Sequence, residues 1–352
     1  MPDLDQKRSG AFLESIKTAF HGSMLVMMVD LGHRAGLFSA LSDGSVTVEG
    51  LAERTGQSAR HLREWLGAMA VAGVVEFDEV SERFTLPAEH AMWLTGTSYT
   101  NLAPMAGMFT GLAPRIDDVI ESFRTGDGVS YDRYRPHFTH AMDALGRAKY
   151  DALLVRAYLP KAGNLADALR AGIRVADVGC GTGHCVNILA AAFPESSFTG
   201  FDIADDAIAL ARAEAEHLGL TNAAFASVDV RQLPIDPPFD ALFAFDAIHD
   251  QHDPVGVLER MRAGLKSGGT LFMLDIKASS NLVDNIADPA MLVLYGTSVL
   301  HCMQVGLHGG GAGLGTVWGT QLATQMLHDA GFASVTIHDL PGDPTNCLYV
   351  CR

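Results

Sequence analysis

The second half of the chain alternates short apolar runs with longer amphipathic segments. Five apolar runs predict buried strands, at residues 173–178, 197–202, 223–228, 239–245 and 270–275. A helix and two further strands complete this half, at residues 318–330, 334–340 and 346–351. Strands that alternate with helices form a parallel sheet with helices on both faces. We therefore predict an α/β fold whose seven-stranded sheet is closed by a terminal β-hairpin.

Residues 1–98 show a different pattern, which predicts a mainly helical domain. Apolar positions indicate a helix around Phe12–Phe20 and a second helix from Met24 to Leu41. Thr47 and Ser58 are each placed to cap a further helix. Two short strands follow these helices, at residues 74–78 and 83–86. A helix-turn-helix followed by a hairpin is typical of a winged-helix domain.

Residues 99–171 predict a helical connector that covers the active site. The connector is rich in aromatic and histidine side chains, and we expect some of them to contact a ligand. The candidates stand shortly before the first strand of the sheet: Tyr131, Tyr134 and His137. The alternative is that these side chains only pack in the core. The third predicted domain extends from residue 172 to residue 352.

The charge of the chain argues against nucleic acid and anionic membranes as partners. The formal net charge is −16, which repels phosphate groups. The predicted winged helix, residues 43–86, has four arginines against eight acidic residues. Its hairpin carries Glu79 and Glu82 where a phosphate-binding wing would need Lys or Arg. We therefore expect this domain to serve dimerisation or to form a wall of the active site.

The cysteines and the apolar segments bear on the compartment. The five cysteines form no C-x-x-C pair, so the sequence predicts neither a disulfide framework nor a metal site. The apolar segment Met24–Val29 is too short to span a bilayer, and no secretory leader is expected. These observations predict a cytoplasmic protein without a membrane anchor.

A glycine turn follows the first strand of the predicted sheet. The sequence from Val175 to Gly183 reads V-A-D-V-G-C-G-T-G, and a helix follows it. Glycines allow a backbone to approach a ligand closely. A dinucleotide fingerprint, G-x-G-x-x-G, would need glycine at His184. Asp177 stands two residues before the first glycine, so the turn suits a cationic ligand better than a pyrophosphate.

Together with three later landmarks, this turn resembles the first motif of the class I S-adenosylmethionine-dependent methyltransferases. Asp202 ends the second strand, Asp229 follows the third, and Phe245 stands near the end of the fourth. By this resemblance, Asp177 holds the amino group of the methionine part, Asp202 the ribose and Asp229 the adenine. The resemblance implies S-adenosylmethionine as cofactor, S-adenosylhomocysteine as product, and these cofactor-binding residues: Asp177, Gly179, Cys180, Gly181, Gly183, Asp202, Ile203, Asp229, Val230 and Phe245.

The segment after the fourth strand reads D-A-I-H-D-Q-H-D-P from Asp246 to Pro254. It is similar to the segment of small-molecule O-methyltransferases in which a His-Asp pair follows this strand and the histidine is the general base. These enzymes also carry an N-terminal winged-helix dimerisation domain. His249 is therefore the candidate base, and a homodimer is expected. Gln251 stands where that group has Trp, and a structural role for His249 remains the alternative.

Residues 276–316 predict a flexible lid over the acceptor, inserted between the fifth strand and the next helix. The segment is apolar and ends in a glycine run, and no Lys or Arg occurs between residues 278 and 351. We expect a hydrophobic or aromatic small-molecule acceptor, methylated at oxygen, with His301 and Trp318 as candidate contacts. The alternatives are a transcriptional regulator built on the same cofactor fold and a protein or RNA methyltransferase.

Overall fold

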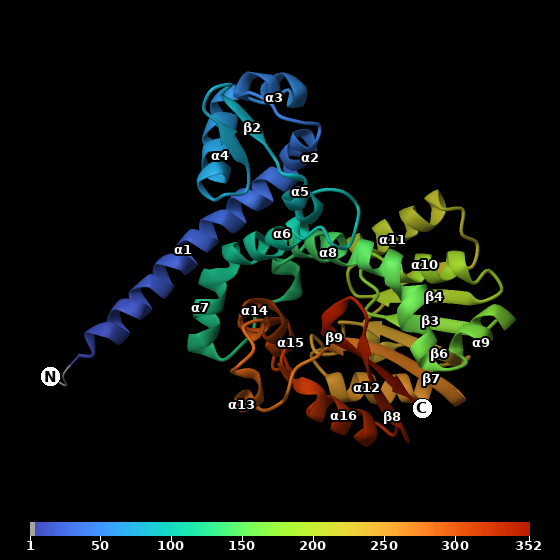
Figure 1. Ribbon diagram of the computed structural model, residues 1–352. Coiled ribbons are helices and arrows are strands. Elements are labelled where there is room, and N and C mark those ends of the chain that lie inside the picture. The colour runs from blue at the N-terminus through green and yellow to red at the C-terminus, as the bar shows by residue number, and fades with distance from the viewer. Residues whose placement is uncertain (1–3) are drawn as a thin grey trace. The chain divides into compact units, whose positions relative to one another are not determined.

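The computed structural model describes residues 4–352 and divides into two compact units. The first unit extends to Ala113 and the second from Pro114 to Arg352 (Figure 1). Within residues 4–352, no helix combines the length and the apolar character that a bilayer crossing requires.

The first unit is mainly helical. Its elements are α1 (Gln6–Arg34), α2 (Leu37–Ser42), α3 (Val48–Thr55), α4 (Ala59–Val71), β1 (Glu76–Asp78), β2 (Arg83–Thr85), α5 (Ala88–Leu94) and α6 (Ala103–Leu112). The apolar face of α4 packs in the core of the unit, where Leu66 is fully buried and the Trp65 indole donates a hydrogen bond to Met28 O. The antiparallel pair β1–β2 follows α4, as predicted.

The caps of this unit agree only partly with the sequence prediction. Thr47 accepts a hydrogen bond from Gly50 N at the start of α3, as expected. Ser58 precedes α4, but its side chain makes no capping hydrogen bond. The predicted break between two N-terminal helices near residue 23 was wrong, because α1 continues through this region. The helix ends instead just before Gly36, which adopts a left-handed conformation (φ 70°).

The second unit is built on a seven-stranded sheet, which confirms the predicted fold class. Its strands are β3 (Arg174–Val178), β4 (Ser197–Asp202), β5 (Ala223–Ser227), β6 (Phe239–Phe245), β7 (Leu265–Ile276), β8 (Val335–Leu340) and β9 (Asp343–Cys351). The spatial order is β5-β4-β3-β6-β7-β9-β8. The first five strands in this order are parallel, and β9 pairs antiparallel with both β7 and β8.

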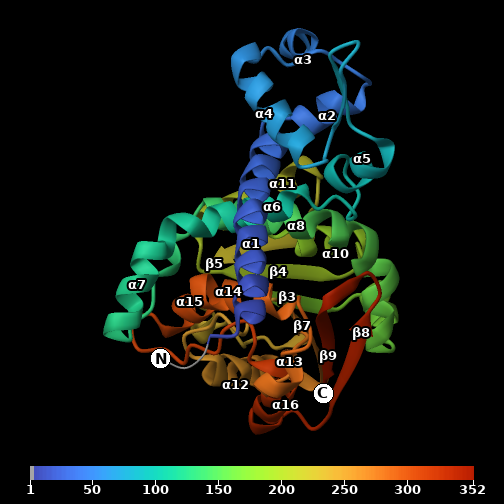
Figure 2. The same ribbon diagram turned by 60° about the vertical axis from the view of Figure 1, so that its left-hand side comes forward.

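Helices cover both faces of the sheet, because the strands are apolar on both sides. In β3, Val175 packs with one core cluster, while Ala176 and Val178 pack with the other. The first cluster includes residues of α9 (Leu165–Ala171), α10 (His184–Ala192) and α11 (Asp205–His217). The second includes residues of α12 (Pro254–Gly264) and α16 (Gly319–Asp329), which lie on the opposite side of the sheet (Figure 2).

Helical segments precede the sheet, as the sequence predicted. They are η1 (Ala113–Arg115), α7 (Ile116–Thr125), η2 (Tyr131–Arg133), α8 (His137–Leu153), the π-helical turn η3 (Leu154–Tyr158) and η4 (Leu159–Ala162). The short helix η5 (Val230–Gln232) follows β5.

Much of the predicted lid, residues 276–316, is helical instead of a flexible loop, and its role as a lid over the acceptor stays a prediction. It contains α13 (Leu282–Asn285), α14 (Met291–Thr297), the π-helical turn η6 (Ser298–Cys302) and α15 (Met303–Leu307). The insertion packs closely on the connector, since a Cβ on Gly128 would lie 1.9 Å from Gln304 O. Tyr134 also donates a hydrogen bond of 2.7 Å to Leu300 O. The glycine run contacts α15 as well, because Gly313 N donates a hydrogen bond of 3.2 Å to Gly306 O.

Two glycines of the turn between β3 and α10 differ in their surroundings. Gly183 has a φ of 72°, and an added Cβ would lie 2.5 Å from Ala211 Cβ and from the Phe225 ring. Gly181 has a φ of 53°, but an added Cβ would meet nothing within 4 Å.

We expect Gly183→Ala to lower the free energy of unfolding by about 3 kcal/mol, since it adds overpacking to the cost of a left-handed backbone. Gly181→Ala should cost about 1 kcal/mol, the backbone cost alone. Urea denaturation of both variants measures the difference. Equal losses would contradict the close packing at Gly183.

Candidate active site

The glycine turn lies at the carboxyl edge of the sheet and is held from two sides. Gly179 N and Cys180 N both donate to Phe201 O, at 2.8 and 3.0 Å. A Cβ on Gly179 would lie 2.6 Å from Ala247 Cβ, so the segment after β6 packs directly on the turn. The open space at Gly181 is where a ligand can approach the backbone.

Asp177 is a buried carboxyl group beside this turn. Its side chain is 3% exposed, and its Oδ1 atom has no hydrogen-bond partner. Burial and the nearby charge of Asp202 raise the pKa of Asp177 to about 7. An unpaired buried acid is costly, and a cation beside it would remove most of that cost.

Asp202 ends β4 and braces the turn. Its two carboxyl oxygens accept hydrogen bonds from Gly181 N at 2.8 Å and Ala204 N at 2.9 Å. Burial raises its pKa, although these hydrogen bonds oppose the effect. Each oxygen retains a lone pair for a ligand hydroxyl. The neighbouring Ile203 is 59% exposed and offers an apolar surface.

Asp229 is engaged more heavily than the sequence indicated. It caps η5 by accepting from Arg231 N at 3.0 Å, and it forms an ion pair with the Arg231 guanidinium. The hydrogen bonds from Arg231 lower the pKa of Asp229. Val230 beside it is buried. Phe245, near the end of β6, packs edge-on against Tyr150 of α8 with 5.5 Å between ring centroids.

His184, which breaks the dinucleotide fingerprint, has a structural task that the sequence did not reveal. Its Nδ1 lies 2.9 Å from Glu214 Oε1 in α11, and its Nε2 lies 2.9 Å from Asp151 Oδ1 in α8. Thr182 donates a 2.6 Å hydrogen bond to Asp143 of α8. Through these contacts, Thr182 and His184 hold helix α8 of the connector against the end of the glycine turn.

His249 lies in the segment after β6, where it forms a buried ion pair. It is 3% exposed, and its Nδ1 lies 2.7 Å from Asp275 Oδ1, which is fully buried near the end of β7. The Trp318 indole donates to the same oxygen at 3.0 Å. Trp318 itself is only 3% exposed.

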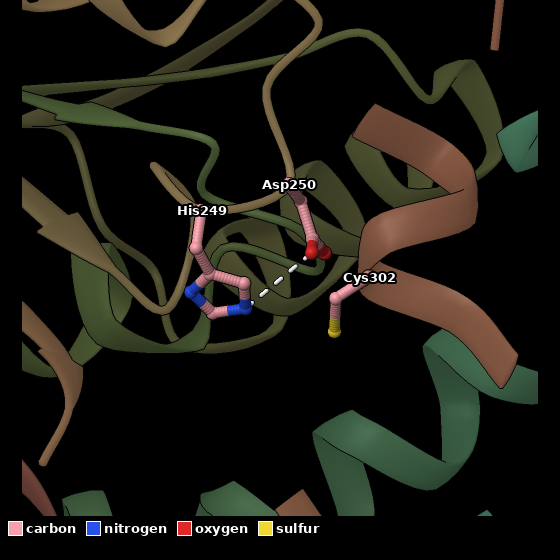
Figure 3. A group of neighbouring side chains, drawn as sticks. All are labelled: His249, Asp250 and Cys302. Carbon is pink, nitrogen blue, oxygen red and sulfur yellow. Dashed lines mark ion pairs between the residues drawn. The ribbon is translucent and has the colours of Figure 1, made fainter. Parts of the chain in front are cut away.

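The other ring nitrogen of His249 faces Asp250 and Cys302. Figure 3 shows the three side chains converging, Cys302 from η6 and the other two from the segment after β6. His249 Nε2 lies 3.3 Å from Asp250 Oδ1. Burial alone would lower the pKa of His249, but the carboxyl groups of Asp275 and Asp250 outweigh it and hold the pKa well above its ordinary value.

Within residues 4–352, these three residues form a group whose residue types and spacing could hold a metal ion. Their ligand atoms lie within 4.8 Å of one another. Metals bind the thiolate form of cysteine, whereas burial raises the pKa of the Cys302 thiol to about 11. The high pKa keeps the Cys302 thiol protonated near neutral pH, which disfavours a metal ion at these three residues.

The candidate acceptor contacts differ in where they lie. His301 of η6 is buried, and its ring stacks on Phe138 with 3.8 Å between centroids. Tyr134 packs edge-on against the same ring at 4.6 Å. Burial and the nearby charges of Asp202 and Asp250 raise the pKa of Tyr131 to about 12. Tyr131 therefore lies near both of these acids. His137 is exposed at the start of α8.

The sequence analysis did not single out Asp275 as the buried partner of His249. The sequence prediction treated Asp275 only as the last residue of an apolar strand. Asp202, a predicted site residue, holds the same position at the end of another strand. The contact with His249, in the segment after the neighbouring strand β6, depends on the β6–β7 register, which places Phe245 beside Leu274.

Comparison with known proteins agrees with this geometry. Residues 169–331 match the family model of a methyltransferase domain, and residues 23–96 match that of an Rv2258c-like winged HTH domain. In sequence order, the chain carries a winged-helix domain followed by a methyltransferase domain. A curated relative, the trans-aconitate 2-methyltransferase of Methylobacterium nodulans, is 32% identical over 122 residues, which are 35% of this chain and 43% of the relative. The malonyl-[acyl-carrier protein] O-methyltransferase of Acetivibrio thermocellus is 29% identical over 28% of this chain and 33% of its own length.

Each of these matches covers 35% or less of this chain and less than half of the relative. Solved structures match the whole chain. The mitomycin 7-O-methyltransferase MmcR has a TM-score of 0.71 at 19% identity, covering 98% of this chain and 99% of its own. Human N-acetylserotonin methyltransferase in complex with SAM has a TM-score of 0.71 at 16% identity, with coverage of 100% and 99%. At this identity the likeness shows a shared fold.

Proposed function

We propose that this protein transfers a methyl group from S-adenosylmethionine to an oxygen atom of a small apolar or aromatic acceptor. The observation that carries the proposal is the unpartnered Asp177 Oδ1 beside the glycine turn of a methyltransferase domain. A buried acid without a partner suits the ammonium group of the methionine part. The open backbone at Gly181 leaves room for the cofactor.

The residues around the turn fit the other parts of this cofactor. Asp202 retains lone pairs for the ribose hydroxyls, and Asp229 with Val230 lies where the adenine is expected. Asp229 would accept from the adenine amino group while it stays paired with Arg231. We assign the cofactor to these residues: Asp177, Gly179, Cys180, Gly181, Gly183, Asp202, Ile203, Asp229, Val230 and Phe245.

When bound, S-adenosylmethionine would supply an electrophilic methyl carbon, with S-adenosylhomocysteine as the product. The chain must then align the acceptor oxygen with that carbon and remove its proton. His249 Nε2 accepts the proton, and Asp275 keeps the ring oriented and stabilises the resulting imidazolium. Asp275 is a positioning residue, since it acts through His249. A purely structural His249 is the competing assignment.

Cofactor binding tests the first half of the proposal. Isothermal titration calorimetry with S-adenosylmethionine should show binding that weakens at least about tenfold in Asp177→Asn and in Asp202→Ala, because each loses a charged hydrogen bond. Asp205→Asn, an exposed acid at the start of α11, is the matched control. Unchanged affinity in both site variants, or no binding by the intact chain, would overturn the assignment.

The pH dependence of methyl transfer tests the base. Only neutral His249 accepts a proton, so the rate should fall as the pH drops through the pKa of His249, which lies above its ordinary value near 6.5. Asp275→Asn removes the main stabiliser of the imidazolium and should move this limb to lower pH. His249→Gln should lose the limb and about 10²–10⁴-fold in rate.

His308→Gln changes a half-exposed histidine of the same insertion and should leave the profile intact. A His249→Gln variant with full turnover would support the structural role instead. Chelators should not reduce the rate, since this mechanism uses no metal.

The acceptor class separates the remaining alternatives. A labelled methyl group transferred to a cell extract should appear in the small-molecule fraction, whereas label in protein or RNA would favour a macromolecular substrate. The acidic wing, with Glu79 and Glu82 in the turn between β1 and β2, supports the view that the winged helix does not bind DNA. The five free thiols suit a reducing cytoplasm.

We also propose that α1 mediates a homodimer. Several of its apolar side chains are exposed and form one stripe along the helix: Leu13, Phe20, Met24, Met27 and Leu31. Exposed stripes of this kind mark protein–protein contacts. A second copy of α1 offers the same stripe, and self-complementarity is what a twofold interface requires.

Light scattering after size exclusion should give a dimer for the intact chain. Phe20→Glu with Met24→Glu should yield monomers, because like charges would face each other in an apolar contact. Thr18→Glu, on another side of α1, should leave the dimer intact. A monomeric intact chain would contradict the proposal.

A further inference from the structure

A second cavity lies between α10 and α11, and it shares no lining residue with the proposed cofactor site. Its volume of about 470 Å³ lies in the range of small-molecule sites, about 300–1,000 Å³. The two helices lie side by side in Figure 1. Four lining residues stand at positions i, i+3, i+4 and i+7 of α10, so they form one face of this helix: His184, Asn187, Ile188 and Ala191.

One part of the cavity is apolar and open to solvent. Ile188 is half-buried, whereas Ala191 and Ala192 are exposed at the end of α10. Leu218, which follows α11, is 51% exposed on the same cavity. Because the two alanine side chains are short, they leave room above the helix for the apolar body of a ligand. Burying such a body removes apolar surface from water on both sides.

The other part of the cavity is polar and contains a neutral histidine. Arg147 Nη1 lies 2.7 Å from His184 Nδ1, and a guanidinium group can only donate a hydrogen bond. His184 Nδ1 is therefore the acceptor, and the ring proton lies on Nε2, which donates to Asp151 Oδ1 at 2.9 Å. Arg147 also pairs with Glu214. The neutral His184 ring thus offsets none of the surrounding charge.

The polar part has an excess of negative charge. Asp143 and Glu214 share the guanidinium of Arg147, while Asp151 pairs with the neutral His184, so three carboxyl groups stand against one arginine. The Asp151 side chain is 55% exposed, so a ligand can reach it from solvent. A positively charged group placed here would offset the excess, whereas a carboxylate would be repelled.

Asn187 adds an unpaired acceptor to this polar part. The residue lines the cavity and is fully buried. Its Nδ2 donates to Glu214 Oε2 at 3.0 Å and to Ala211 O at 3.3 Å, but its Oδ1 has no hydrogen-bond partner. Leaving a buried acceptor unpaired costs about 1–3 kcal/mol. A ligand that brings a donor to this oxygen would recover that cost.

We propose that this cavity binds a small amine with an apolar body. The ammonium group pairs with Asp151 and Glu214, and the apolar body packs on Ile188 and Leu218. An alkylammonium group is charged at neutral pH and carries three N–H donors. The unpaired Asn187 Oδ1 is the acceptor left for the third donor. The inference goes beyond the proposed methyl transfer and does not depend on it.

Calorimetry with three matched probes on the full-length protein tests the ligand class. The probes 2-phenylethylamine, 2-phenylethanol and 3-phenylpropionate share one aromatic body and differ in the charge of the head group. The amine should bind with a Kd at or below about 1 mM, and the other two at least about tenfold more weakly, because they lack a charged donor. Equal binding of the alcohol or the carboxylate, or no binding of the amine at about 10 mM, would overturn the inference.

Variants locate the amine in this cavity. Ala191→Phe fills the apolar part and should weaken amine binding at least about tenfold, whereas Ala213→Phe, at an exposed position of α11 outside the cavity, should not. Asp151→Asn and Asn187→Leu should each weaken binding at least about threefold. Thermal melts check that each variant folds. If Asn187→Leu does not fold, Ala191→Phe and Asp151→Asn decide, and full affinity in Ala191→Phe would overturn the site.

Asp177 is the other buried acid that could attract an amine, so it provides a further control. Asp177→Asn should leave the Kd of 2-phenylethylamine unchanged, and a lost affinity would place the amine at the glycine turn and overturn the inference. Calorimetry with S-adenosylmethionine on the same samples keeps the two proposals apart. Cofactor binding without amine binding removes only the amine site, and amine binding without cofactor binding removes only the proposed methyl transfer.

Discussion

The buried pair of His249 and Asp275 is the interaction on which the proposed acceptor side of the site depends. One oxygen, Asp275 Oδ1, receives donors from His249, Trp318 and Ile276 N. These donors belong to the segment after β6, to the residue before α16 and to β7 itself. A buried ion pair is retained only where further hydrogen bonds satisfy it, and these bonds join the insertion to the sheet. The orientation of His249 and the position of the insertion are therefore set together.

The proposed cofactor side also contains buried acids whose charge must be compensated. Asp177 and Asp202 are both buried beside the same glycine turn, so each disfavours the charge of the other. Backbone N–H groups satisfy Asp202, whereas Asp177 Oδ1 stays without a partner. A fold that keeps an acid in this state gains stability when a cation binds, because the ligand binds only the folded chain. The pKa of about 7 at Asp177 makes that gain larger as the acid ionises.

The sequence predicted the strands and the glycine turn because both depend on local patterns. Apolar runs identified all seven strands of the large sheet, and the V-G-C-G-T-G run predicted the turn after β3, whose three glycines have positive φ in the structure. The insertion was misread because its helices carry polar residues such as His301 and Gln304 on buried faces, which breaks the apolar period. Asp275 and His184 were missed for another reason. Their partners lie on other elements, so only strand register and helix packing reveal them.

Acids lie on the proposed cofactor side and on the proposed acceptor side of the site, and on both sides they can stabilise a positive charge. In the proposed mechanism, methyl transfer starts with a positive charge near Asp177 and Asp202 and ends with a positive charge on His249, between Asp275 and Asp250. In this mechanism, carboxyl groups stabilise the positive charge before and after the reaction, and all of them except the partly exposed Asp250 are buried. Such fixed groups need no reorientation as the charge moves, which is the condition for electrostatic stabilisation of a transition state.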